Sequence, residues 1–175
     1  MKMFLLTAVF LLSAGQTAYA AGEHEHGHGE DGRVAGEPGN IKDAARTVEV
    51  VMRDNYYEME SIRVKKGETV RFVVKNEGVL VHEFNIGTAA MHSAHKDEML
   101  MMMRHGVLSP TKIHRDKMES ADGHSMRHDD PNSVLLQSQE TAEVVWKFTA
   151  AANLEFACNI PGHYESGMVG EFKWQ

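Results

Sequence analysis

The chain has 175 residues, of which 42% are hydrophobic, and this suits one compact domain with a buried core and some additional sequence. Its formal net charge is −7, and no block of Lys and Arg occurs, so we expect no nucleic-acid partner. An acidic surface favours basic protein partners or simple solubility.

Residues 1–20 have the pattern of a cleavable secretory signal peptide. Lys2 supplies the positive charge near the start of the segment. It is followed by an apolar run and then by an Ala-x-Ala cleavage site that ends at Ala20. The apolar run is too short to span a membrane, and no later segment is long and apolar enough to do so. We therefore expect export to the periplasm and no membrane span.

Residues 21–46 are predicted to form a disordered, His-rich tail. They are rich in Gly and charged residues and contain almost no large apolar side chain. His alternates with small or acidic residues in this tail, at His24, His26 and His28. Such a tract binds metal flexibly and with modest selectivity, or it is simply a solvated tail, and both interpretations stay open.

From residue 47 to residue 175 the pattern is that of a β domain. Short runs rich in β-branched residues alternate with Gly, Asn and Pro turn signals. About seven or eight such strands favour an all-β fold, a two-sheet sandwich with Greek-key connections. The expected strands are 47–52, 61–64, 68–75, 79–86, 133–136, 141–149, 153–158 and 168–174.

An insertion at 87–132 interrupts the strands. Thr88 is a plausible N-cap, and residues 89–105 have helical character. One face of this helix is expected to carry a stripe of Met with one His, namely Met91, His95, Met99 and Met102 or Met103. Such a stripe packs the helix onto the domain, or its thioethers and imidazoles hold additional copper as Cu(I).

The composition is unusual in its sulfur and imidazole side chains. The chain has 11 His, 12 Met and a single Cys, Cys158. One Cys cannot form an internal disulfide, so in an exported protein it is either a small buried hydrophobe or a metal ligand. Thiolate, imidazole and thioether together are the ligand set that suits copper.

The segment 156–168 carries the strongest functional signal. It presents Cys158, His163 and Met168 at equal intervals of five residues, with the Cys at a strand end and Gly and Pro in the loop. A blue copper centre needs one Cys, two His and a weak axial Met. His82, among the β residues of a distant strand, supplies the second imidazole. We predict one copper ion held by these four residues.

These motifs resemble the cupredoxin family of blue copper proteins over about residues 47–175, with a ligand-loop spacing of the rusticyanin type. The phrases VHEFNIG, HDDPNS and CNIPGHYESGMVGEF look like those of bacterial periplasmic copper-tolerance cupredoxins. The resemblance implies a Greek-key cupredoxin β-sandwich with a His/Met-rich, partly helical insertion. One position departs from it: Glu83 follows His82, where many cupredoxins have an Asn that tethers the ligand loop by hydrogen bonds.

Such a copper site is compatible with three kinds of function. The first is copper handling and tolerance, which the tail histidines, the Met-rich insertion and the resemblance favour. The second is diffusible electron transfer by the same site. The third is an enzyme such as a multicopper oxidase or copper nitrite reductase, but those enzymes place a His beside the copper Cys, and here the neighbours are Ala157 and Asn159. We therefore expect a monomeric non-enzyme whose partners are copper ions and a redox or copper-exporting protein.

Overall fold

The computed structural model describes residues 35–119, 125–127 and 129–175. The expected signal peptide, residues 1–20, lies outside the described residues. The same holds for most of the expected tail, including the tract of His24, His26 and His28.

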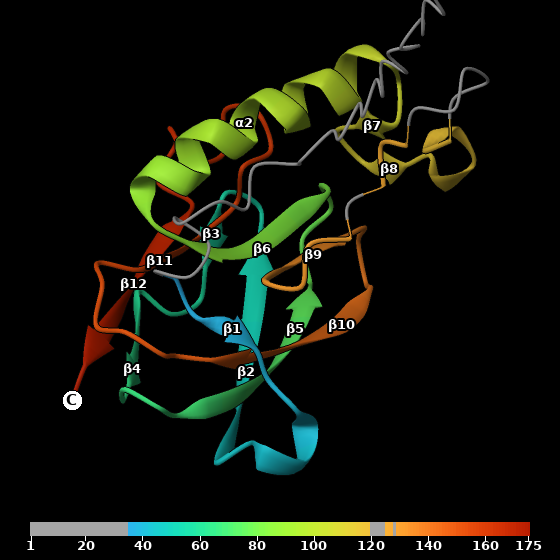
Figure 1. The fold of residues 1–175 in the computed structure, drawn as a ribbon. Coiled ribbons are helices and arrows are strands. Elements are labelled where there is room, and N and C mark those ends of the chain that lie inside the picture. The colour runs from blue at the N-terminus through green and yellow to red at the C-terminus, as the bar shows by residue number, and fades with distance from the viewer. Residues whose placement is uncertain (1–34, 120–124, 128) are drawn as a thin grey trace, which may run out of the picture.

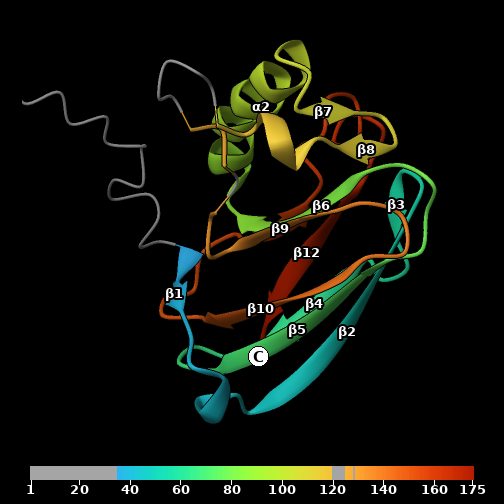
Figure 2. The ribbon, with the colours of Figure 1, turned by 90° about the vertical axis from the view of Figure 1, so that its right-hand side faces the viewer.

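Two five-stranded sheets pack face to face in the described part of the chain, and Figures 1 and 2 show them as two layers. In the first sheet the order is β1 (Glu37–Pro38), β10 (Thr141–Lys147), β5 (Thr69–Asn76), β2 (Arg46–Arg53) and β3 (Tyr56–Tyr57). In the second it is β4 (Ser61–Val64), β12 (Val169–Trp174), β11 (Glu155–Ala157), β6 (His82–Gly87) and β9 (Ser133–Leu136). The expected all-β sandwich is confirmed.

Strand order differs from chain order, because connections cross from one sheet to the other. Strand β2 runs parallel to β5, and β12 runs parallel to β4, whereas the other neighbours in the two sheets are antiparallel. Alternation decides which side chains lie between the sheets: in β5, Val70, Phe72 and Val74 are fully buried on one face. The ring of Phe72 packs in this core against the rings of Phe84, Phe148 and Phe172.

The domain begins earlier than the sequence pattern indicated. Residues 35–46 were expected to belong to a disordered tail, but Ala35 is buried and its carbonyl accepts a hydrogen bond from Trp146 Nε1 at 2.9 Å. Strand β1 pairs with β10, and a 3₁₀ turn at Ile41–Asp43 leads into β2. A two-residue strand has no hydrophobic periodicity, so the pattern could not distinguish it from a solvated tail.

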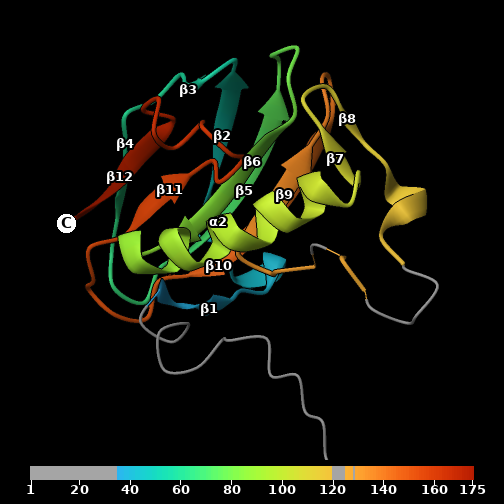
Figure 3. The same cartoon turned by 90° about the horizontal axis from the view of Figure 1, so that it is seen from above.

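The insertion is ordered where the structure describes it. Helix α2 (Ala89–Arg104) lies along the outer side of the second sheet, across β6 (Figures 1 and 3). The Oγ1 of Thr88 accepts from the Met91 N–H at 3.3 Å, which confirms the expected N-cap. A small hairpin of β7 (Leu108–Ser109) and β8 (Lys112–Ile113) and a 3₁₀ turn (Arg115–Lys117) follow the helix.

The Met stripe of α2 contributes to the hydrophobic core. Met99 and Met102 are buried within it, and Met91 and Met103 pack against it. Packing therefore accounts for these four side chains, and an additional copper ion in the insertion stays a prediction. Among the described helices, none is long and apolar enough to cross a membrane.

Candidate metal centre

Pairing between two strands of the second sheet brings the distant ligand candidates together. Strand β11 pairs antiparallel with β6, with Ala157 opposite Asn85, so the chain that continues past β11 runs toward the start of β6. His82 is the first residue of β6, and Cys158 directly follows β11. Two residues that are 76 positions apart in the chain are therefore neighbours in the fold.

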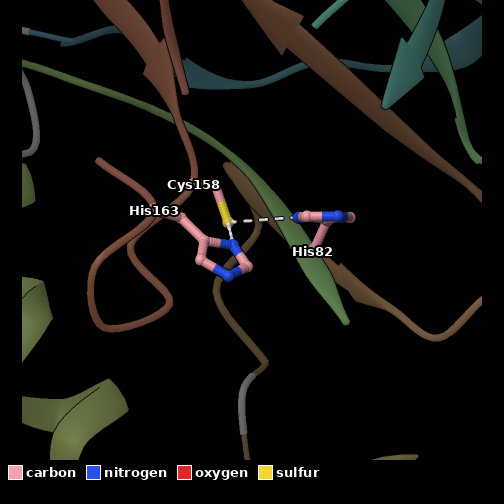
Figure 4. A group of neighbouring side chains, drawn as sticks. All are labelled: His82, Cys158 and His163. Carbon is pink, nitrogen blue, oxygen red and sulfur yellow. Dashed lines mark hydrogen bonds between the residues drawn. The ribbon is translucent and has the colours of Figure 1, made fainter. Parts of the chain in front are cut away.

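Three of the four predicted ligands lie together, with the two His side chains on either side of the Cys158 sulfur. The Sγ of Cys158 lies 3.4 Å from Nδ1 of His163 and 3.9 Å from Nδ1 of His82. Figure 4 shows the sulfur between the two imidazole rings, each turned so that its Nδ1 faces it. The three potential ligand atoms all lie within 4.8 Å of one another, close enough to bind one metal ion.

The fourth predicted ligand, Met168, closes the loop that carries two of the others. Its side chain is fully buried, its N–H donates to the His163 carbonyl at 3.0 Å, and its carbonyl accepts from the Cys158 N–H at 3.1 Å. Gly162 and Gly167 have positive φ values of 91° and 96°, which let the chain turn twice within this short loop. The main chain thus fixes the spacing of the three loop residues before any metal binds.

Asp54 orients the imidazole of His82. Its Oδ1 lies 3.1 Å from His82 Nε2, and the same oxygen accepts from the N–H groups of Val79 and Leu80 at 2.9 Å. A proton on Nε2 that is directed at this carboxylate leaves the lone pair of Nδ1 free to face Cys158. Metal-binding histidines are commonly held in this way, and the sequence analysis did not find this partner.

The protonation states of the ligands follow from their burial. Burial lowers the pKa of His82, and burial together with the nearby His82 lowers the pKa of His163 to about 4. Burial raises the pKa of the Cys158 thiol well above its ordinary value. At neutral pH both imidazoles are therefore neutral and ready to bind a metal, whereas the thiol has a proton to lose.

Glu83 replaces the Asn tether that many cupredoxins have. Its carboxylate is fully buried, and Oε2 accepts from the N–H of Asn159 at 3.0 Å and from Nδ2 of Asn159 at 2.9 Å. Its own N–H points to Cys158 Sγ at 3.3 Å. The strand that carries His82 is thus tied to the loop that carries Cys158, through a carboxylate in place of an amide.

A second cluster of possible ligand atoms lies on the far side of Glu83. It consists of His95, Glu98 and Asp130, all half-buried. Both nitrogens of His95 already face carboxylates, Nε2 at 2.9 Å from Glu83 and Nδ1 at 3.1 Å from Glu98. Burial opposes protonation, but the two carboxylates outweigh it and raise the pKa of His95 to about 10. This cluster is therefore an ion-pair network around an imidazolium.

The donor set at Cys158 fits copper. One thiolate, two imidazoles and a buried Met in the same loop are the ligands of a type 1 copper centre. A zinc site of the structural kind would use four strong ligands, and the described residues bring only three such groups together here.

Comparison with known proteins agrees with this assignment. A model of the cupredoxin-like domain matches residues 3–92, just over half of the chain. The chain belongs to the cupredoxin-like family. This cupredoxin is 49% identical over 152 residues to the copper-resistant cuproprotein CopI of Pseudomonas aeruginosa, covering 82% of this chain and 84% of that protein. It is 40% identical to the protein of the same name from Rubrivivax gelatinosus, over 89% and 86% of the two chains.

Solved structures with a similar fold include blue copper proteins. Auracyanin B superposes on this cupredoxin with a TM-score of 0.58 at 19% identity, over 81% of this chain and 96% of the other. The auracyanin of Roseiflexus castenholzii gives a TM-score of 0.54 at 20% identity, over 75% and 98% of the two chains. At such low identity the likeness supports the fold alone.

Proposed function

We propose that this cupredoxin is exported to the periplasm, binds one copper ion in a mononuclear type 1-like site and serves copper tolerance. The observation that carries the proposal is the buried group of His82, Cys158 and His163, whose ligand atoms already lie within 4.8 Å of one another. The similarity to copper-resistant cuproproteins over more than four fifths of the chain supports the choice of tolerance as the role.

Residues of the protein hold the ligands in position before copper binds. Asp54 orients His82, the bonded loop fixes Cys158 and His163, and Glu83 ties these two parts together. Copper bound there would cycle between Cu(II) and Cu(I). A site that is already assembled needs little rearrangement between the two states, which favours both firm binding and rapid electron exchange.

Diffusible electron transfer is the second candidate function. His163 is only half-buried, unlike His82 and Cys158, so its imidazole offers an edge through which an electron can leave. We do not propose an enzyme, because Ala157 and Asn159 flank Cys158 where oxidases and nitrite reductases use a His to reach a second copper centre.

A copper titration separates the two functions. The protein without residues 1–20 is titrated with Cu(II), its visible spectrum is followed, and bound metal is measured after desalting. One copper per chain together with a strong thiolate band supports electron transfer alone. Further retained copper that disappears when His24, His26 and His28 are replaced by Ala supports copper handling. No thiolate band at all would overturn the proposed site.

Met168→Leu tests the axial ligand. We expect the variant to keep copper and its visible band, because the three strong ligands are intact, but to have a higher reduction potential, because a weak thioether donor to Cu(II) is lost. The measurement is a redox titration of the copper-loaded variant beside the parent protein. An unchanged potential would mean that Met168 only fills the core.

Copper binding is expected to release about one proton per ion at pH 7, because the Cys158 thiol must ionise while the imidazoles are already neutral. The apparent affinity for copper should accordingly fall about tenfold for each unit by which the pH is lowered from 8 to 5. Calorimetric titration in buffers of different ionisation enthalpy measures the proton count. A count near zero would mean that Cys158 is ionised in the apoprotein.

A further inference from the structure

One face of helix α2 contacts the loop that carries the copper ligands. Its residues are His92, His95 and Lys96, which are spaced as neighbours on a helix surface. Lys96 Nζ lies 2.7 Å from a carboxylate oxygen of Glu165 and 3.8 Å from the centre of the Tyr164 ring.

The other two residues of this face reach the residue beside Cys158. Nδ1 of the buried His92 lies 3.2 Å from Nδ2 of Asn159. His95 reaches the same amide through Glu83, since the Glu83 carboxylate joins His95 on one oxygen and Asn159 on the other. The inserted helix therefore contacts the ligand loop at two places, at Asn159 beside Cys158 and at Tyr164 and Glu165 further along the loop.

Any neutral side chain of the same size in place of Glu83 would lose hydrogen bonds. Oε1 faces His95 Nε2 at 2.9 Å, Ser133 Oγ at 2.8 Å and Asn85 Nδ2 at 3.3 Å. Oε2 faces the N–H and the Nδ2 of Asn159. Each of these groups can donate a hydrogen bond, and only a carboxylate accepts on both oxygens. A Gln here would aim its own N–H₂ at donors.

A nearby cation also stabilises a fully buried carboxylate. An unpaired buried charge is costly, and removing one partner of a buried pair is strongly destabilising. His95 lies within hydrogen-bond distance of the Glu83 carboxylate and can carry a positive charge. His95 comes from the insertion, so helix α2 supplies a positive charge that faces this carboxylate.

We propose that His95 is a positioning residue of the copper centre: through Glu83 it holds the loop of Cys158, so that helix α2 sets the affinity and the reduction potential of the site. The inference rests on the proposed copper function. The path from His95 to the ligand sulfur is short, because the N–H of Glu83 itself donates to Cys158 Sγ at 3.3 Å.

Because Glu83 and His95 carry opposite charges, their replacement should shift the reduction potential in opposite directions, which simple loosening of the fold would not do. The negative charge of Glu83 stabilises Cu(II) relative to Cu(I), and the positive charge of His95 offsets it. Glu83→Gln should therefore raise the reduction potential, and His95→Gln should lower it. His95→Lys, which keeps a cationic donor, should restore the potential toward that of the parent.

The experiment compares these variants in the full mature protein. Copper affinity, the visible thiolate band and the reduction potential are measured for the parent, His95→Gln, His95→Lys and Glu83→Gln. The control is Arg104→Gln, which removes the same formal charge about 14 Å further along the helix. Far-ultraviolet circular dichroism verifies that each variant is folded.

The expected result is an affinity loss of about 10-fold to 100-fold in His95→Gln, a lower potential, and partial recovery in His95→Lys, with no change in Arg104→Gln. If Glu83→Gln does not fold, the three other variants still test the role of His95. Equal potentials and affinities in His95→Gln and the parent would overturn the proposal. Absence of a thiolate band in the parent would instead overturn the proposed function.

Discussion

Cys158→Ala is expected to abolish the intense visible band of the copper-loaded protein. That band arises from charge transfer between a thiolate and Cu(II), and Cys158 is the single Cys of the chain. We also expect copper affinity to fall by several orders of magnitude, because two neutral imidazoles and a thioether remain without the one anionic ligand. Visible absorption and equilibrium dialysis against a competing chelator measure the two effects.

The fold of this variant serves as the control. Cys158 is fully buried, and Ala is the smallest side chain that keeps the β carbon, so the apoprotein should retain its secondary structure at some cost in stability. Circular dichroism of the two apoproteins tests this. A variant that is folded and still coloured would show that the thiolate is not the ligand.

Gly170→Ala is expected to destabilise the apoprotein by about 1–3 kcal/mol or more. Gly170 in β12 lies opposite Phe156 in β11, and a β carbon on Gly170 would overlap the Phe156 ring at Cζ. That ring is fully buried and packs on Tyr57, Phe84 and Phe172 at centroid distances of 5.0, 5.8 and 5.4 Å. It has no space to move into, so the strands would have to part.

Urea unfolding of the apoproteins measures the loss in Gly170→Ala. A double-mutant cycle identifies its cause: in a Phe156→Leu background the same change should cost less, because the shorter side chain leaves space for the β carbon. An equal cost in both backgrounds would mean that strand flexibility, and not the aromatic ring, requires the glycine. Copper binding should weaken in parallel, since Phe156 lies two residues before Cys158.

The sequence was most informative where periodicity and chemistry are local. The alternation of Val70, Phe72 and Val74 predicted the buried face of β5, because successive side chains of a strand point to opposite faces. The interval between Cys158 and His163 predicted two ligands in one turn, and the structure places their donor atoms 3.4 Å apart. His82 required a further assumption, that its strand ends beside the loop, and the pairing of β6 with β11 satisfies it.

Contacts between distant segments could not be predicted in this way. Nothing in the sequence around Asp54 or His95 indicates that one side chain orients His82 and the other holds Glu83. The sequence analysis placed His95 on a Met face and considered it as a copper ligand, whereas its ring nitrogens lie against two carboxylates. The role of a polar side chain in a core depends on partners that the fold brings, and these lie 28 and 12 positions away in the chain.

The separation of His82 and Cys158 by 76 positions has a consequence for how copper and folding influence each other. An unfolded chain does not hold the ligands together, so copper binds the native state far more tightly than the denatured ensemble. By mass action, a metal present at about 100 times its dissociation constant would add roughly 2.7 kcal/mol to the free energy of unfolding. The melting temperature of this cupredoxin should therefore report the copper activity of its surroundings, and apoprotein that accumulates during copper scarcity should be the form that proteases remove first.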